Sequence, residues 1–148
     1  MGQNGSGAET KILILASLSG GYRGADAVGQ LHLDYPPNTY IVPVVSAAML
    51  PENFYLETFE KGIDAILVMF SGTDCPFQGS PEMTAQIINR AYGRMKERGI
   101  DTRRLRLVAI CTVCTAAFLR EIQGMEALLE EIGPVAPELA ASPVPQGA

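Results

Sequence analysis

Cysteine, histidine and long apolar runs are all scarce in this sequence. The three cysteines cannot all pair with one another and do not resemble a disulfide framework. No apolar run approaches the ~20 residues needed to cross a bilayer, which argues against a membrane span. The N-terminus also lacks the basic and apolar regions of a signal peptide. We therefore expect a cytoplasmic protein.

Excess positive charge is also missing, and its absence excludes one broad class of partner. The formal net charge is −5, whereas a general nucleic-acid binder needs a broad basic surface. Seven of the eleven basic residues nevertheless cluster in one stretch: Arg90, Arg94, Lys96, Arg98, Arg103, Arg104 and Arg106. Two interpretations stay open for this stretch, a solvated helix face and a docking patch for an acidic partner.

The shares of apolar and charged residues indicate a globular protein with a well-buried core. Apolar residues make up 47% of the 148 residues and charged residues 18%, which suits a single domain with a sizeable core. Residues 1–10 are small and polar and predict a flexible lead. Residues 11–133 contain the periodic segments of the domain, and residues 134–148, rich in proline and alanine, predict a loose tail.

Strands and helices alternate four times along the domain. Apolar runs predict strands near residues 11–17, 40–46, 63–70 and 105–110. Helical spacing predicts helices near 24–33, 51–61 and 80–98, and a last helix that runs to about residue 132. Pro43 lacks an N–H donor, so its strand should lie at a sheet edge or carry a bulge. Right-handed crossovers then predict a doubly wound α/β domain, a four-stranded parallel sheet with helices on both faces.

In such a sheet, ligands bind outside the carboxyl ends of the strands. The loops expected there cover residues 17–23, 46–50, 70–79 and 111–115. Gly20 and Gly21 follow the first strand, but neither the P-loop spacing nor the dinucleotide-binding glycine pattern is present. No serine, histidine and carboxylate arrangement for catalysis can be placed, and we interpret His32 as a solvated or capping residue.

All three cysteines lie on two of these loops. Cys111 and Cys114 stand between a strand and a helix, where a helix N-terminus lowers a thiol pKa, so a dithiol redox or metal role is one interpretation. The alternative is that both pack as small apolar residues. Cys75 lies in a turn-rich loop beside Asp74 and is either an inert surface thiol or a functional one.

Several blocks of the sequence resemble one known family. These are Tyr22-Arg-Gly-Ala-Asp26, Tyr35-Pro-Pro-Asn38, the apolar strand that precedes Asp74-Cys75, and Arg103-Arg-Leu-Arg-Leu107. Together they resemble the delta subunit of methyl-viologen-reducing hydrogenase. The resemblance implies an iron–sulfur subunit with a [2Fe–2S] cluster on cysteines. It also implies protein partners, namely a hydrogenase or formate dehydrogenase and a heterodisulfide reductase whose flavin subunit bifurcates electrons.

The sequence departs from the family at the positions that the resemblance implies for ligands. Family cysteines after the first and second strands correspond here to Ser17-Leu-Ser-Gly20 and to Ser46. Of a pair after the third strand, Phe70 takes the first place and only Cys75 keeps the second. His32 and Met49 stand where the family has basic residues. Because a [2Fe–2S] cluster normally takes four ligands, the resemblance implies a degenerate or altered cluster site.

The sequence thus predicts a subunit of a cytoplasmic electron-transfer complex. Any cluster would take Cys75, Cys111 and Cys114 from this chain, with a serine, water or partner residue as the fourth ligand. The second hypothesis is a cluster-free docking or scaffold module, in which a pocket could bind a small polar ligand. The residues of that pocket would be Ser17, Tyr22, Ser46, Ser71 and Asp74. The third is a dithiol redox protein that works through Cys111 and Cys114.

Overall fold

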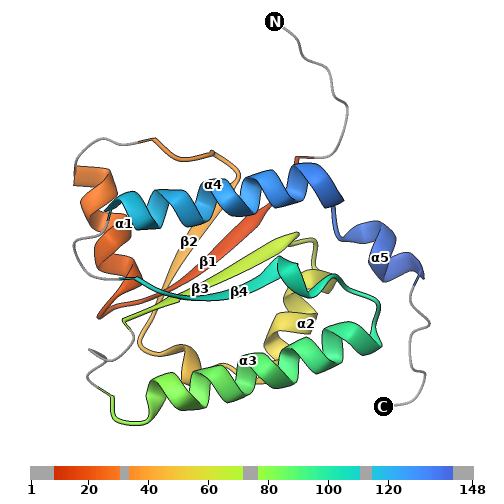
Figure 1. Cartoon of the computed structure of the whole chain (residues 1–148), viewed down its shortest axis with the longest axis horizontal. Coiled ribbons are helices and arrows are strands. Elements are labelled where there is room, and N and C mark those ends of the chain that lie inside the picture. The colour runs from red at the N-terminus through yellow and green to blue at the C-terminus, as the bar shows by residue number, and fades with distance from the viewer. Residues whose placement is uncertain (1–8, 31–33, 72–76, 111–114, 142–148) are drawn as a thin grey trace, which may run out of the picture.

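Four strands form one parallel sheet in the order β2-β1-β3-β4 (Figure 1). The structure is a computed structural model that describes residues 9–30, 34–71, 77–110 and 115–141. The strands are β1 Ile12–Ser17, β2 Thr39–Val44, β3 Ala65–Phe70 and β4 Leu105–Ala109. Ile14 of β1 pairs with Ile41 of β2 on one side and with Leu67 of β3 on the other. The predicted four-stranded parallel sheet is confirmed, and Pro43 lies on an edge strand as expected.

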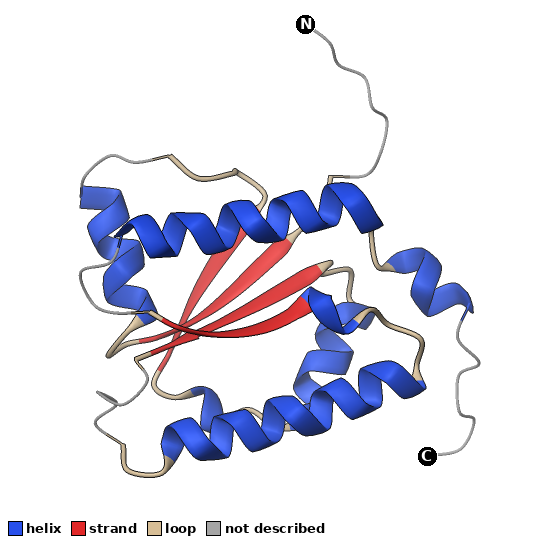
Figure 2. Cartoon of the chain, in the orientation of Figure 1, coloured by secondary structure: helices blue, strands red, loops and turns tan. Residues whose placement is uncertain are grey.

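Helices cover both faces of this sheet, as the doubly wound prediction requires (Figure 2). Helices α1 (Gly21–Gln30) and α4 (Thr115–Ile132) lie on one face, and α2 (Glu52–Glu60) and α3 (Ser80–Glu97) lie on the other. Successive strand residues point to opposite faces, so β1 sends Ile14 toward α4 and Leu15 toward α3. Two separate apolar cores result, one with Phe118 and Ile122 and one with Tyr55 and Phe59.

The helix boundaries follow the local signals closely. Gly62 and Gly99, which follow α2 and α3, have φ values of 102° and 72°, a region that glycine adopts without steric cost. Helix α3 begins at Ser80, and Gly79 is its N-cap residue. Helix α1 begins at Gly21, three residues before the predicted start. Two short 3-10 helices, η1 (Ala47–Met49) and η3 (Thr102–Arg104), precede α2 and β4.

The segment after Gly133 differs from the loose tail that its composition predicts. Residues Ala136–Ala141 form a short helix, α5, and the Val135 side chain before it is buried. The backbone N–H of Val135 donates to the Asp64 carboxylate over 2.8 Å, and the Glu138 carboxylate accepts from the N–H of Asp101 over 2.9 Å. Long-range polar contacts therefore order this segment, which single-sequence composition cannot reveal.

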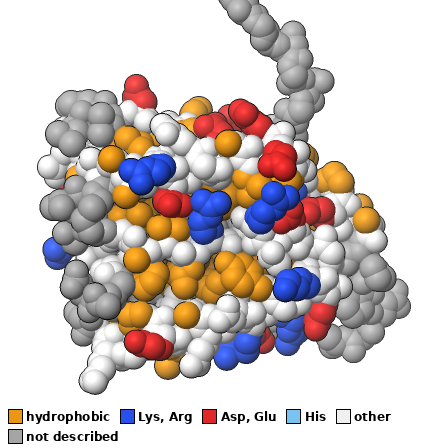
Figure 3. Space-filling model, in the orientation of Figure 1, with side chains coloured by type: hydrophobic (Ala, Val, Ile, Leu, Met, Phe, Trp, Pro, Cys, Tyr) orange, Lys and Arg blue, Asp and Glu red, His pale blue; other side chains and the backbone are white. Residues whose placement is uncertain are grey.

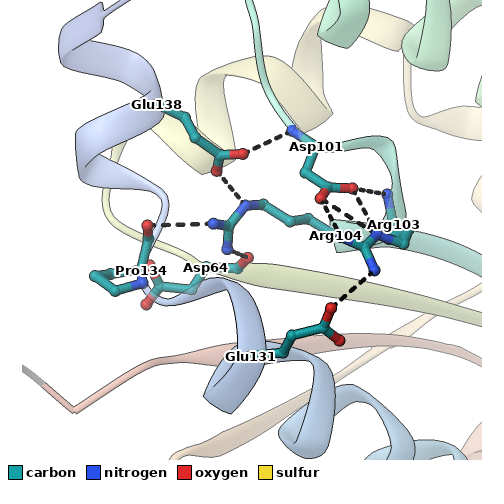
Figure 4. A network of polar contacts seen from close by, with 7 residues as sticks. All are labelled: Asp64, Asp101, Arg103, Arg104, Glu131, Pro134 and Glu138. Carbon is teal, nitrogen blue, oxygen red and sulfur yellow. Dashed lines mark hydrogen bonds and ion pairs between the residues drawn. The ribbon is translucent and has the colours of Figure 1, made fainter.

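Arg104 is the centre of a polar network at the amino edge of the sheet (Figure 4). Its side chain is fully buried, donates to the carbonyl oxygens of Asp64 and Pro134, and pairs with Glu138. The Asp64 carboxylate accepts from two backbone N–H groups, that of Val135 at one oxygen and that of Lys11 at the other. The network therefore connects the starts of β1, β3 and β4 to α5.

No helix in the described ranges is long and apolar enough to cross a membrane.

Candidate functional site

The strand order reverses between β1 and β3, which makes their carboxyl ends the switch point of the sheet. In Figure 1 the four carboxyl ends lie on the left, and α5 lies on the right. The loop after β1 and the first residues after β3 touch directly at this point. The hydroxyl oxygens of Ser19 and Ser71 are 3.1 Å apart and share a hydrogen bond.

Gly20 allows this close approach of the two loops. A Cβ atom added at Gly20 would lie 2.7 Å from the backbone nitrogen of Ser71, closer than real Cβ contacts. Gly21 is similarly confined, because its Cβ would meet the Met69 side chain. The glycine pair that follows β1 therefore has a packing role in the described structure, and this agrees with the absence of a phosphate-binding motif from the sequence.

The three cysteines lie outside the described residues, on segments 72–76 and 111–114, but the chain on either side of these segments is placed. Phe70 and Ala109 are register partners at the ends of β3 and β4. The N–H of Ile110, the residue before Cys111, donates to the Phe70 carbonyl over 2.8 Å. The two loops that carry the cysteines therefore leave the sheet from neighbouring strand ends.

The described residues at this edge supply hydroxyl groups and no thiolate. Ser19 pairs with Ser71, and the hydroxyl of Ser46 hydrogen-bonds to that of Ser80. Within the placed parts of the chain, no three His, Cys, Asp or Glu side chains converge as a metal site would need. A [2Fe–2S] cluster usually takes four thiolates, and the whole sequence contains three. The chain by itself therefore does not complete such a ligand set.

The structure distributes the predicted polar-pocket residues over several places. Ser17 is buried at the end of β1, and Ser71 lies at the switch point. Tyr22 borders a hollow of about 450 Å³ between α1 and β2, whereas Ser46 borders a different groove beside α3. Asp74 and also His32 fall outside the described residues. Tyr22 and Ser46 thus line separate hollows.

The groove beside Ser46 is a feature that the sequence reasoning missed. It has a volume of about 320 Å³ and lies between η1 and the first turn of α3. Its apolar lining comes from two segments, with Val45, Ala48 and Met49 on one side and Phe77 and Met83 on the other. Large apolar side chains in predicted loops, at Met49 and Phe77, were the available signal.

Ion pairs within the chain take up most of the basic cluster, which argues against a docking patch for an acidic partner. Arg90 and Arg94 both contact Glu52 of α2, and Arg106 contacts Glu121 of α4. The remaining pairs are Arg98 with Glu60, Arg103 with Asp101 and Glu131, and Arg104 with Glu138. Figure 3 shows the two signs of charge interspersed on the face that carries α3, β4 and α4. A docking patch for an acidic partner would need unneutralised positive charge.

Comparison with known proteins returns two kinds of relative, a reductase chain and a hydrogenase iron–sulfur subunit. The chain is 29% identical over 119 residues to a subunit of the ferredoxin:CoB-CoM heterodisulfide reductase of Methanosarcina mazei, a match that covers 80% of this chain and 15% of the relative. It is 23% identical over 124 residues to the vhu iron-sulfur subunit of the F420-non-reducing hydrogenase of Methanocaldococcus jannaschii, covering 83% and 92%. The iron-sulfur subunit of the corresponding hydrogenase of Archaeoglobus profundus is 24% identical, with 85% and 93% covered.

The chain thus spans about 15% of the length of the reductase relatives and more than nine-tenths of these two hydrogenase relatives. A family profile described as methyl-viologen-reducing hydrogenase, delta subunit, matches residues 12–133, from the start of β1 to the residue after α4. The resemblance seen in the sequence is confirmed. This chain belongs to the family of the methyl-viologen-reducing hydrogenase delta subunit.

Proposed function

We propose that this protein is a subunit of a cytoplasmic electron-transfer complex of the hydrogenase and heterodisulfide reductase type. One observation carries the proposal. The same domain matches nearly the whole of separate hydrogenase subunits and a small part of a much longer reductase chain. A domain that is a separate chain in one relative and is covalently joined to a reductase in another is expected to work beside that reductase.

The proposal includes an altered iron–sulfur site at the carboxyl edge of the sheet. The hydrogenase relatives are named iron-sulfur subunits, which supports an iron–sulfur link. Cys75, Cys111 and Cys114 are the thiols that this chain offers, on loops that begin at the neighbouring ends of β3 and β4. A [2Fe–2S] cluster there would need a fourth ligand from a serine, water or a partner protein.

Anaerobic purification of the protein from cells that load clusters efficiently tests the cofactor part of the proposal. A bound cluster gives broad visible absorbance with stoichiometric iron and acid-labile sulfide. Cys75→Ser should then remove or shift this absorbance. The partner part is tested separately, by mixing the purified protein with the heterodisulfide reductase-like chain encoded in the same genome and measuring complex formation.

A colourless, iron-free protein that still forms the complex would favour the cluster-free docking module. The apolar groove and the mutually paired hydroxyls at the carboxyl edge are the observations that support this second candidate. A dithiol protein would instead show two rapidly reacting thiols that protect each other on oxidation, and Cys111→Ser would abolish that protection.

A further inference from the structure

The groove between η1 and the first turn of α3 exposes unusually large apolar side chains. Met49 is 73% exposed, Met83 54%, Val45 49% and Phe77 46%, and none of the described residues that line the groove is charged. Single exposed apolar residues are common on protein surfaces, but several that line one hollow usually mark an interaction site. With such a lining the groove suits an uncharged occupant, because burying an unpaired charge is costly.

Hydrogen bonds hold the two walls of the groove in place. The hydroxyls of Ser46 and Ser80 bond to each other, which joins the segment after β2 to the start of α3. The Ser46 oxygen also accepts from the backbone N–H of Ala48 over 3.2 Å, and the adjacent Ala47 is buried. The groove is therefore formed before any partner arrives, which lowers the entropy cost of binding.

The described ends of the chain lie away from the groove. The described chain ends at Ala141, which lies with Gly99 at the carboxyl end of α3, whereas the groove lies at the amino end of that helix (Figure 1). The 18 residues of α3 span about 27 Å, which separates Ala141 from the groove. At the other end, the described chain starts before β1, at the amino edge of the sheet, whereas the groove lies at the carboxyl edge.

A second copy of the chain is also a poor occupant. Both copies would carry a net charge of −5, which opposes self-association. The reductase relatives, in contrast, contain the matched domain within a chain in which it makes up only 15% of the length. A larger neighbouring chain can anchor in the groove and contribute contacts elsewhere.

We propose that this groove is the docking site for an uncharged apolar segment of the heterodisulfide reductase-like chain. The inserted residues would be one or two large apolar side chains, such as leucine, methionine or phenylalanine. Phe77 directly follows the segment that carries Cys75, so the docked chain would lie next to that segment. This inference rests on the proposed function, since it takes its partner from there.

The test measures the dissociation constant between the purified full-length protein and the purified reductase-like chain from the same genome. Met49→Glu and Phe77→Glu place a carboxylate in the groove and should weaken binding at least 30-fold, about 2 kcal/mol at ~1.4 kcal/mol per tenfold. Tyr35→Glu is the matched control, because Tyr35 is 38% exposed and lies outside the groove. Its binding should stay within threefold of the unchanged protein, as should that of Met49→Leu.

Each outcome decides between the two proposals. If the unchanged protein and both groove variants bind equally well, the groove is not the docking site, and the proposed partner stands. If the unchanged protein does not bind, the proposed function fails and the groove's assignment with it. If the protein alone is a dimer in sedimentation and Met49→Glu makes it a monomer, the occupant is a second copy and the assignment is wrong. Thermal unfolding of each variant establishes that a loss of binding is not a loss of fold.

Discussion

At the amino edge of the sheet, charged groups are buried and satisfied, whereas at the carboxyl edge hydroxyls pair with one another and apolar side chains face solvent. Arg104, Asp64 and Glu138 join β1, β3, β4 and α5 through specific hydrogen bonds. The side-chain bonds between the described loops of the carboxyl edge are those of Ser19 with Ser71 and of Ser46 with Ser80. The amino edge is thus built for stability, and the carboxyl edge leaves surface free for a partner.

The two edges also differ in charge, since paired charged side chains lie at the amino edge and the described lining of the groove at the carboxyl edge is uncharged. Hydrogen bonding to Arg103 holds the pKa of the Asp101 carboxyl below its ordinary value at the amino edge. The groove at the carboxyl edge has no charged side chain among its described lining residues. Docking into the groove should therefore respond little to pH and salt, because the described walls bring no charge to the interface.

The largest effect is expected at the amino edge, from Arg104→Met. The change leaves the Asp64 and Pro134 carbonyls and the Glu138 carboxylate without their donor, and breaking a buried pair in this way costs about 3 kcal/mol. For a chain of this size that lowers the unfolding midpoint by about 6–12 °C. Arg103→Met, at a neighbouring but half-exposed ion pair, is the control and should cost much less. Equal losses in the two variants would contradict the special role of the buried arginine.

A second prediction tests whether the carboxyl edge also contains a rigid point. Gly20→Ala should cost about 1–3 kcal/mol in free energy of unfolding, because the new methyl group collides with the backbone of Ser71. Gly29→Ala, in the last turn of α1 with open space around it, should be neutral or slightly stabilising. Urea unfolding of both variants measures the difference. A neutral Gly20→Ala would mean that the loops after β1 and β3 can separate freely.

Tyr55, in the apolar core, lies at neither edge and gives a third position for comparison. The buried Tyr55 hydroxyl has no hydrogen-bond partner among the described residues, so Tyr55→Phe should stabilise the protein by about 1 kcal/mol at pH 7. Tyr40→Phe, at an exposed tyrosine of β2, should not change stability. A destabilised Tyr55→Phe would reveal a partner for the hydroxyl and a polar role for this core.

Burial raises the pKa of Tyr55 from 10.0 to about 12. The unfolded chain therefore loses this proton at lower pH than the folded protein does. The stability linked to Tyr55 is present below pH 10 and is lost as the pH rises from 10 to about 12. Denaturant unfolding across this range should show a steeper loss in the unchanged protein than in Tyr55→Phe, and parallel curves would exclude the linkage.

The smallest effect is expected from the hydroxyl pair that frames the groove. Ser46→Ala and Ser80→Ala should each cost about 0.5–1 kcal/mol, since each leaves one hydroxyl without its neighbour. The double variant should cost less than the sum of the two, by a coupling energy of about 0.5 kcal/mol or more. A double-mutant cycle by urea unfolding measures this coupling, and simple additivity would show that the two walls are held by other contacts.

The sheet edge at which the candidate site is proposed could be predicted, because it depends on local patterns. Apolar runs located the strands, and in a parallel sheet the loops that follow them start at one edge. The grouping of polar residues could not be predicted in the same way. Tyr22 and Ser46 lie in separate hollows because α1 and η1 leave the sheet on opposite faces.

The sequence alone determined the α/β class and the parallel sheet, because both follow from the periodicity of apolar residues. It also determined that the strand with Pro43 lies at the sheet edge, because proline has no N–H to donate, and it determined the family through matching sequence blocks. Only the tertiary structure decided that most of the basic cluster is paired with carboxylates of the same chain and that residues 136–141 are held as a helix. It alone also showed that Met49, Phe77 and Met83 line one groove. Each of these features joins residues that are far apart in the sequence, and packing in three dimensions sets such distances.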